Sequence, residues 1–188
     1  VPLKRLPRPS LSRGHNAVSD FIPVARIADM LLNPGQPYSF NGNQRSFPDI
    51  RLVYWCGGNP FHHHQDLNRL REAWKEPETV IVHEPWWTAT AKHSDIVFPA
   101  TTPYEREDIA RSATDSFLFH MPELIPPLND ARDDYQIFSE LAARLHIDEV
   151  FTEGRDADAW LRYLYKGFQR DSADQGVDLP DYDSLRAT

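Results

Sequence analysis

Three short apolar runs, each followed by a turn or a polar segment, constrain the fold of this chain more than any other feature. They occupy residues 52–56, 79–82 and 96–98 and are rich in β-branched or aromatic residues, which is typical of buried strands. Helical segments are predicted between them, at residues 67–74 and 86–92. This alternation predicts an α/β fold, a Rossmann-like three-layer unit with a mostly parallel sheet and helices on both faces. Ligands bind such sheets outside the carboxyl ends of the strands.

Apolar residues at helical spacing predict further helices on either side of this core. One begins near Pro23 and ends at Asn33, before a Pro-Gly pair. Two more begin near Asp134 and Ala157, each with a clear apolar stripe. The chain therefore has amphipathic helices at both ends of the predicted sheet.

The remaining segments predict short strands and loops. Asn41-Gly42 lies between two short apolar segments, and this dipeptide supplies the positive φ angles of a hairpin turn. Residues 100–114 are polar and predict a long loop. Residues 117–119 predict a strand.

Charge and cysteine content limit the partners of the chain. Its formal net charge of -8 would be repelled by nucleic acid and by anionic membranes, so neither is expected as a partner. No apolar run approaches the roughly 20 residues that cross a bilayer. A single cysteine excludes an internal disulfide framework.

Composition also predicts the domain boundaries. The first ten residues include three prolines, and residues 1–20 are predicted to be a linker from a preceding domain. With 188 residues, of which 40% are hydrophobic, one folded domain is expected, at residues 21–170. The acidic residues 171–188 are predicted to be a tail or linker. Because the sequence begins with Val and a linker, we expect it to be a piece of a longer protein.

Gly57, Gly58 and Asn59 follow the first predicted strand and precede a helix. Free backbone N–H groups at such a place favour an anion, so these residues can form a phosphate cradle. The dinucleotide-binding fingerprint, which needs a third glycine, is absent. An ordinary tight turn is the alternative.

Acids and aromatics around the later strands suggest roles of their own. Glu84 lies 26 residues after Gly58 (84 minus 58), and an acid roughly 20 residues beyond such glycines binds ribose hydroxyls in nucleotide-binding sheets. The alternative is a solvated surface acid. Asp95 begins a predicted strand, and we expect its side chain to make a structural hydrogen bond. Trp86 and Trp87 predict core packing at the start of a helix that is capped by a threonine.

Three consecutive histidines, His62 to His64, suggest a metal site, to which His83 and His93 could contribute further ligands. Three consecutive histidines point in different directions, however, so the spacing disfavours a metal centre. Loop packing or a hydrogen bond to a ligand, for which His63 is the candidate, is the preferred interpretation. No hydrolase constellation is evident, and Cys56 lacks an activating base, so no catalytic residue is assigned within this chain.

Two long blocks resemble a known family. Residues 54–66, YWCGGNPFHHHQD, and residues 82–102, VHEPWWTATAKHSDIVFPATT, closely resemble the dimethyl sulfoxide reductase family of molybdenum oxidoreductases, nearest its biotin sulfoxide and trimethylamine N-oxide reductase branch. Residues 21–35 extend the resemblance. It implies a longer enzyme that carries bis(molybdopterin guanine dinucleotide) and reduces S-oxides or N-oxides. Its third domain, Rossmann-like, binds the guanine nucleotide arm of one pterin.

The same resemblance assigns residues to that arm. Asn59 matches an asparagine near the nucleotide, and His83 with Glu84 matches a ribose-binding pair, although relatives often have the shorter Asp. Arg106 matches a basic residue that touches the cofactor. Asp134 aligns with an acid that reads the guanine edge. The partners implied are the remaining domains of the enzyme, with an unknown electron donor.

Other functions remain open at this point. The main alternative is a free-standing nucleotide-binding or interaction module without redox function, and a weaker one is a histidine-rich metal hydrolase. For the isolated piece, the resemblance implies neither catalysis nor bound cofactor, because the molybdenum-ligating serine lies in another part of such enzymes. The biotin sulfoxide branch favours a cytoplasmic location over a periplasmic one.

Overall fold

A computed structural model describes residues 10–11, 15–18, 21–112 and 117–187. The chain divides into two compact units. Residues 15–100 form the first, which we call the sheet unit, and residues 1–14 with 101–188 form the second, which we call the helical unit. Each unit is described by itself below. The predicted boundaries at residues 20 and 170 stay predictions.

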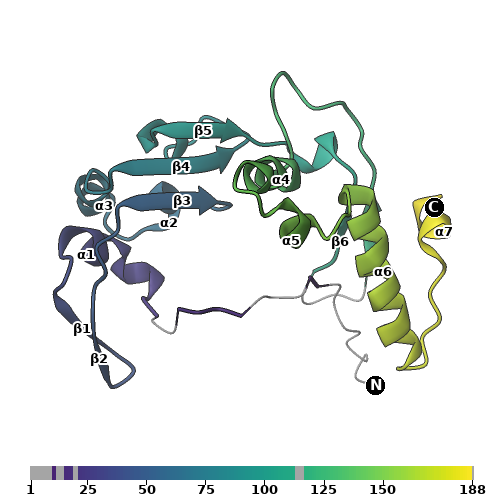
Figure 1. The fold of residues 1–188 in the computed structure, drawn as a ribbon, viewed down its shortest axis with the longest axis horizontal. Helices are drawn as coiled ribbons and strands as arrows, with labels where there is room; N and C mark the ends of the chain where they lie inside the picture. Colours follow the sequence, from purple (N-terminus) through teal and green to yellow (C-terminus); the bar gives the residue numbers. More distant parts are fainter. Residues whose placement is uncertain (1–9, 12–14, 19–20, 113–116, 188) are drawn as a thin grey trace. The chain divides into compact units, whose positions relative to one another are not determined.

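The sheet unit is built on the parallel strands β3 (Leu52–Cys56), β4 (Thr79–Glu84) and β5 (Ile96–Pro99). Figure 1 shows them side by side with their arrowheads at the same edge, in the order β3-β4-β5. Val53 pairs with Val80 and Val82 with Val97. The predicted α/β fold with a parallel sheet is therefore confirmed.

Short helices connect these strands and cover one face of the sheet. They are α2 (Pro60–His63), α3 (Leu67–Ala73) and the 3-10 helix η2 (Ala91–His93). Before the sheet come the 3-10 helix η1 (Val24–Arg26) and α1 (Ile27–Leu32). The residues that α1, α2, α3 and β4 contribute form one core, which comprises Ala28, Leu31, Phe61, Leu70, Ala73, Trp74 and Val80.

Two sequence-predicted features of the sheet unit are confirmed in detail. The hairpin consists of β1 (Pro37–Phe40) and β2 (Asn43–Ser46). Asn41 and Gly42 between them have φ angles of 48° and 77°, as a tight hairpin turn requires. Asp95 accepts a hydrogen bond from the backbone N–H of Val80 (2.8 Å), so its predicted structural role holds.

The predicted helix at residues 86–92 is wrong, since only η2 forms there. Trp86 and Trp87 are 68% and 72% exposed, so their predicted packing in the core is also wrong. Thr88 Oγ1 donates to Glu84 and accepts from the backbone N–H of Ala91, three residues later, as a helix N-cap does, so the helical turn begins after Thr88 and not at residue 86.

The helical unit contains two predicted helices and several shorter elements. Its helices are α4 (Asp134–Arg144), α5 (Asp148–Thr152), α6 (Ala157–Ala173) and α7 (Tyr182–Arg186). The predicted loop contains the 3-10 helix η3 (Pro103–Glu105) and β6 (Asp108–Ala110), which pairs antiparallel with β7 (Phe119–Met121). β7 begins two residues after the predicted strand start, at residue 119 instead of 117. Among the described residues, no helix has the length and apolar character that crossing a bilayer requires.

α7 lies in the segment for which the sequence predicts a tail. Tyr182 is 6% exposed and donates a hydrogen bond to Glu107 Oε1 (3.0 Å). Burial and this carboxylate raise the pKa of Tyr182. Arg186 forms an ion pair with the same glutamate (2.7 Å). These contacts attach the end of the described chain to Glu107, the residue before β6.

The core of the sheet unit generates the first prediction. Leu70 is fully buried against the sheet, whereas Arg71 on the same helix is exposed. Leu70→Ala should lower the free energy of unfolding by about 2–5 kcal/mol, because it removes buried methyl groups and leaves a cavity. Arg71→Ala is the control and should change it by less than about 0.5 kcal/mol. Urea denaturation of both variants measures the difference, and equal stabilities would contradict this core.

Candidate functional site

Gly57 and Gly58 directly follow β3, at the carboxyl edge of the sheet. Gly57 and Gly58 have φ angles of 78° and 75°, a region that side chains other than glycine rarely adopt. Both are exposed. A Cβ atom added at Gly57 would meet no atom within 4 Å. The backbone there is therefore accessible to a ligand, and its N–H groups can act as donors to an anion.

Asn59, the next residue, is fixed by the connection between β4 and β5. Its Oδ1 accepts a short hydrogen bond from Oγ1 of Thr90, which is fully buried. Nδ2 of Asn59 has no hydrogen-bond partner among the described residues. This amide therefore offers a positioned donor beside the glycines.

Glu84 ends β4 at the same edge of the sheet. Its Oε1 accepts a hydrogen bond from Oγ1 of Thr88 (3.0 Å). Its Oε2 has no hydrogen-bond partner within the described part of the chain. One oxygen thus fixes the carboxylate while the other is available to accept from a ligand hydroxyl.

His83 does not join Glu84 at this site. Successive side chains of a strand point to opposite faces of the sheet, so the two residues of the predicted pair diverge. His83 is 4% exposed, and its Nε2 is hydrogen-bonded to Oη of Tyr54 (2.8 Å). Its ring also lies edge-on to Phe98, with 5.6 Å between ring centroids. These contacts give His83 a packing role.

The other histidines do not gather into a metal site. His62 and His63 are exposed on α2, with their ring centroids 5.2 Å apart. His93 stacks on Phe61 at 4.2 Å. Both ring nitrogens of His64 are buried without a hydrogen-bond partner in the described structure. Among the described residues, no group of three His, Cys, Asp or Glu side chains could hold a metal ion.

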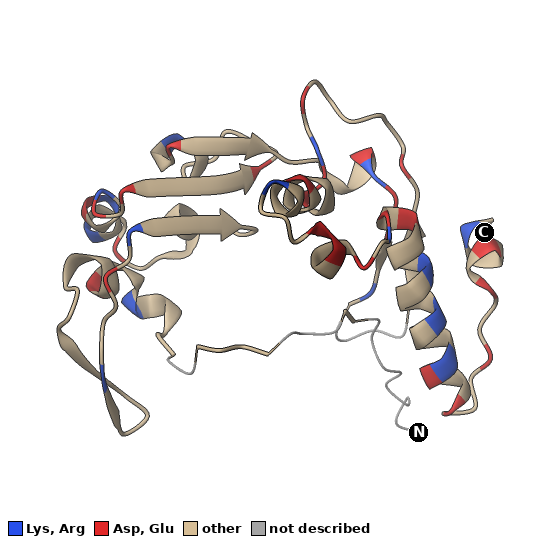
Figure 2. Cartoon of the chain, viewed as in Figure 1, with Lys and Arg blue, Asp and Glu red and all other residues tan. Residues whose placement is uncertain are grey.

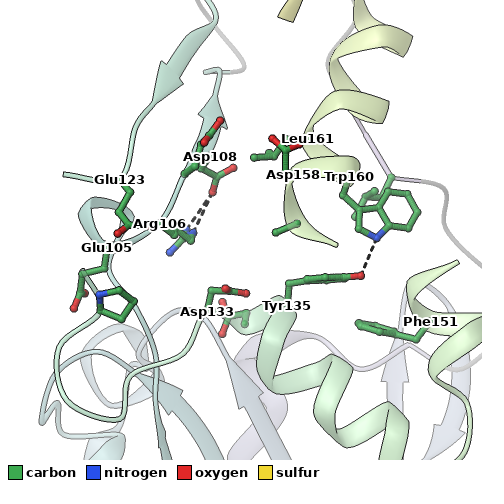
Figure 3. A pocket seen from close by; sticks show the side chains of 15 residues that line it. Glu105, Arg106, Asp108, Glu123, Asp133, Tyr135, Phe151, Asp158, Trp160 and Leu161 are labelled. Atoms are coloured by element: carbon green, nitrogen blue, oxygen red, sulfur yellow. Dashed lines mark hydrogen bonds and ion pairs between the residues drawn. The ribbon is translucent and has the colours of Figure 1, made fainter. Parts of the chain in front are cut away.

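A second candidate site lies within the helical unit. It is a cavity of about 580 Å³ between the first turns of α4 and α6 and the loop that precedes β6. Figure 3 shows Tyr135, Phe151 and Trp160 on one side of it and Arg106 with Asp108 on the other. Asp134 also lines this cavity, so the structure brings the predicted residues Arg106 and Asp134 together.

Hydrogen bonds hold the aromatic side of the cavity. Trp160 Nε1 donates to Oη of Tyr135 (3.1 Å), which in turn donates to the backbone carbonyl of Arg155. The guanidinium of Arg155 lies 4.6 Å from the ring centroid of Trp160, a cation–π distance. At the start of α4, Asp133 caps the helix by accepting from the N–H of Gln136 (2.8 Å). The first turn of α4 is thereby fixed at the cavity.

Glu105 holds the opposite side. Its Oε2 accepts from the backbone N–H and from Oγ1 of Thr102 (both 2.7 Å), and its Oε1 accepts from the N–H of Leu128 (2.8 Å). These hydrogen bonds, those from Thr102 first, lower the pKa of Glu105. The next residue, Arg106, donates to the carbonyl of Thr101 (3.2 Å) and lies 3.3 Å from Asp108 Oδ2.

Sequence reasoning missed four positioning residues. Thr88 and Thr90 were considered only as a possible helix cap, whereas they hold Glu84 and Asn59. The pattern Thr-x-Thr shortly after the strand-end acid Glu84 could have indicated that these threonines hold side chains at the strand ends. No sequence signal connected Tyr135 with Trp160, because their contact joins separate helices.

Comparison with known proteins identifies the family. The family model for molybdopterin oxidoreductases matches residues 23–144, which include every site residue predicted from the sequence. The chain belongs to the molybdopterin oxidoreductase family. The sequence-based resemblance to molybdenum oxidoreductases is thereby confirmed.

Several members of this family are similar over most of the chain. Biotin sulfoxide reductase of Cereibacter sphaeroides is 51% identical over 95% of it, and dimethyl sulfoxide/trimethylamine N-oxide reductase of Rhodobacter capsulatus is 46% identical over 88%. Trimethylamine-N-oxide reductase of Haemophilus influenzae is 44% identical over 88%. The chain spans only 24% of the first relative and 20% of the other two. It corresponds to a minor part of these molybdopterin oxidoreductases.

The hydrogen bonds of Glu105 generate a prediction of pH dependence. Because its pKa in the folded chain lies below the ordinary 4.5, the carboxylate stabilises the fold above pH 4.5. This stabilisation is lost as the pH falls through the lowered value. Glu105→Gln should therefore lower the melting temperature at pH 7, and the gap to the unmodified chain should narrow below pH 4.5.

Thermal unfolding followed by circular dichroism at several pH values measures this gap. Glu76→Gln, at an exposed position on the surface of the sheet unit, controls for the loss of one carboxylate. A gap that stays constant from pH 7 into acid would contradict the role of the ionised Glu105.

Proposed function

We propose that this chain is the cofactor-binding part of a molybdenum-dependent S-oxide or N-oxide reductase, and that it binds the guanine nucleotide arm of bis(molybdopterin guanine dinucleotide). One observation carries the proposal. In a chain of the molybdopterin oxidoreductase family, Gly57, Gly58, Asn59 and Glu84 line one edge of a parallel sheet, where nucleotides bind in such folds. The remaining domains of the same enzyme are the proposed partners, and its proposed location is cytoplasmic.

The sheet edge fits the phosphate and ribose portion of the arm. The exposed backbone of Gly57 and Gly58 offers N–H donors without a side chain in the way. Nδ2 of Asn59 adds a neutral donor, and Oε2 of Glu84 is an acceptor for ribose hydroxyls. His83 supports the edge through Tyr54 and does not contact the ribose in this proposal.

The cavity of the helical unit fits the base. Guanine presents an N–H and an exocyclic amine on one edge, and the carboxylate of Asp134 can accept from both. Tyr135 and Trp160 supply aromatic surface for a base. The carboxylates that line this cavity outnumber its single arginine, Arg106, and would repel phosphates: they are Glu105, Glu107, Asp108, Glu123, Asp133, Asp134 and Asp158. The cavity is therefore proposed to accept the base and not a phosphate.

Oxygen-atom transfer is the chemistry that molybdenum supplies in such a reductase. The residues of this chain bind and orient the nucleotide arm and carry out no chemical step. A free-standing module, the alternative function, gains no support from the relatives, which are about four to five times longer than the aligned chain.

This division of labour predicts that residues 1–188 alone are inactive. The purified chain should not reduce methionine sulfoxide or trimethylamine N-oxide with dithionite-reduced viologen. The full-length protein, produced in a host that makes the cofactor, should do so in the same assay. Turnover by residues 1–188 would overturn the assignment of chemistry to the missing domains.

The base site predicts the effect of Asp134→Asn in the full-length protein. The change removes one charge-assisted acceptor, and such hydrogen bonds are worth about 1.5–3 kcal/mol, so affinity for the nucleotide arm should fall about 10- to 150-fold. Molybdenum and the guanosine monophosphate released on acid treatment, both measured per protein, should decrease together. Asp130→Asn, in the exposed loop before α4, is the matched control. Unchanged guanosine content in Asp134→Asn would contradict the base site.

A further inference from the structure

α7 reaches two carboxylates that line the cavity of the helical unit. Arg186 Nη2 lies 2.7 Å from Glu107 Oε2, and Nη1 of the same guanidinium lies 3.5 Å from Asp158 Oδ1. Glu107 directly precedes β6, and Asp158 belongs to the first turn of α6. Both residues line the cavity. One guanidinium of α7 therefore joins two separate elements of the cavity wall.

Two further residues of α7 add to these connections. Tyr182 donates a hydrogen bond to Glu107 Oε1 (3.0 Å). Asp183 Oδ1 accepts from Arg162 Nη2 (2.8 Å), and Nε of this arginine donates to Asp158 Oδ2 (2.8 Å). Figure 2 shows basic side chains along α6 and charges of both signs on α7. α7 is thus connected to each of the two wall carboxylates at more than one point.

Apolar packing holds α7 against α6 independently of these charges. Tyr182 is buried in a cluster with Leu161, Tyr165 and Phe168. The segment before α7 is also held, because Oη of Tyr165 donates to the backbone carbonyl of Pro180 (2.8 Å). Burial of large side chains stabilises such a contact more than ion pairs near the surface do. The ion pairs of Arg186 are therefore not required to keep α7 folded onto the helical unit.

Repulsion between like charges gives this guanidinium a second role. Seven carboxylates line the cavity, and the arginine that lines it, Arg106, pairs with Asp108 (3.3 Å). Glu107 and Asp158 share Arg186 as a counter-charge, and without it these two carboxylates would repel each other and move the two wall elements apart. Hydrogen bonds to a base weaken steeply with distance and angle. A base in the cavity therefore depends on the separation that the guanidinium maintains.

We propose that Arg186 is a positioning residue for the base: it holds the loop before β6 and the first turn of α6 at the separation that a bound base requires, and it thereby couples ligand binding in the cavity to the attachment of α7. This inference rests on the proposed function, which assigns the base to this cavity. Coupling between two sites is reciprocal. A ligand in the cavity should therefore strengthen the attachment of α7, just as α7 should strengthen binding of the ligand.

Hydrogen exchange in the full-length protein tests this coupling. The protein is produced in a host that makes the cofactor and in one that does not, and exchange of the α7 amides is followed by mass spectrometry. These amides should exchange at least about fivefold more slowly in the cofactor-loaded form, which is the lower end of typical coupling factors. Arg186→Gln should abolish this difference. Arg170→Gln is the matched control and should retain it, since Arg170 pairs with the neighbouring Asp171 (3.0 Å) and does not line the cavity.

The comparison of the two forms separates positioning from simple stabilisation of α7. If Arg186 only stabilised α7, the variant would exchange faster in both forms by the same factor. The difference between the loaded and the cofactor-free protein would then persist in Arg186→Gln, and this result would overturn the inference.

Guanosine content in the same samples distinguishes this inference from the proposed function. Arg186→Gln should lower the guanosine monophosphate that is retained after dialysis, and Asp134→Asn tests the base site itself. Full content and a persistent exchange difference in Arg186→Gln, when Asp134→Asn loses guanosine, tell against this inference alone. A lost exchange difference in Arg186→Gln, when Asp134→Asn keeps its guanosine, tells against the assignment of the base to Asp134 alone.

Discussion

The register of three parallel strands is the constraint on which the rest of the structure depends. Because β3 and β4 run in the same direction and Cys56 pairs with His83, the residues that follow each strand emerge at one edge. Gly57 and Glu84 each follow a member of this pair, although 26 positions separate them in sequence (84 minus 57, less one). The same register assigns alternate side chains to opposite faces of the sheet, which separates His83 from Glu84. One geometric fact therefore determines which side chains can form the candidate binding edge.

Threonines convert this edge into a site with directed polar groups. A carboxylate or amide at a strand end could rotate freely, and fixing it costs conformational entropy when a ligand binds. Thr88 and Thr90 hold one oxygen each of Glu84 and Asn59, leaving one polar atom of each side chain for a ligand. Thr88 also accepts from the N–H of Ala91, at the start of the single helical turn η2.

The sequence predicted those features that depend on residues close together in the chain, and it missed those that depend on residues far apart. The strands at residues 52–56 and 96–98, the Asn41-Gly42 turn and α4 depend on local patterns, and each was located correctly. The attachment of α7 to Glu107 depends on a distant partner, which no local pattern shows. The edge was predictable for Glu84 because a strand end is a local feature. The cavity at Asp134 was not, since it requires α6 and the loop before β6.

Electrostatics then determines which part of a nucleotide each site can accept. The chain carries a net charge of -8, yet the proposed ligand contains phosphates. Backbone N–H groups and the Asn59 amide are neutral donors, so they can bind an anion without requiring a basic side chain. The cavity at Asp134, where carboxylates predominate, favours the N–H edge of a base and excludes phosphate. Neutral donors at the sheet edge and carboxylate acceptors in the cavity are thus suited to different chemical groups of a nucleotide.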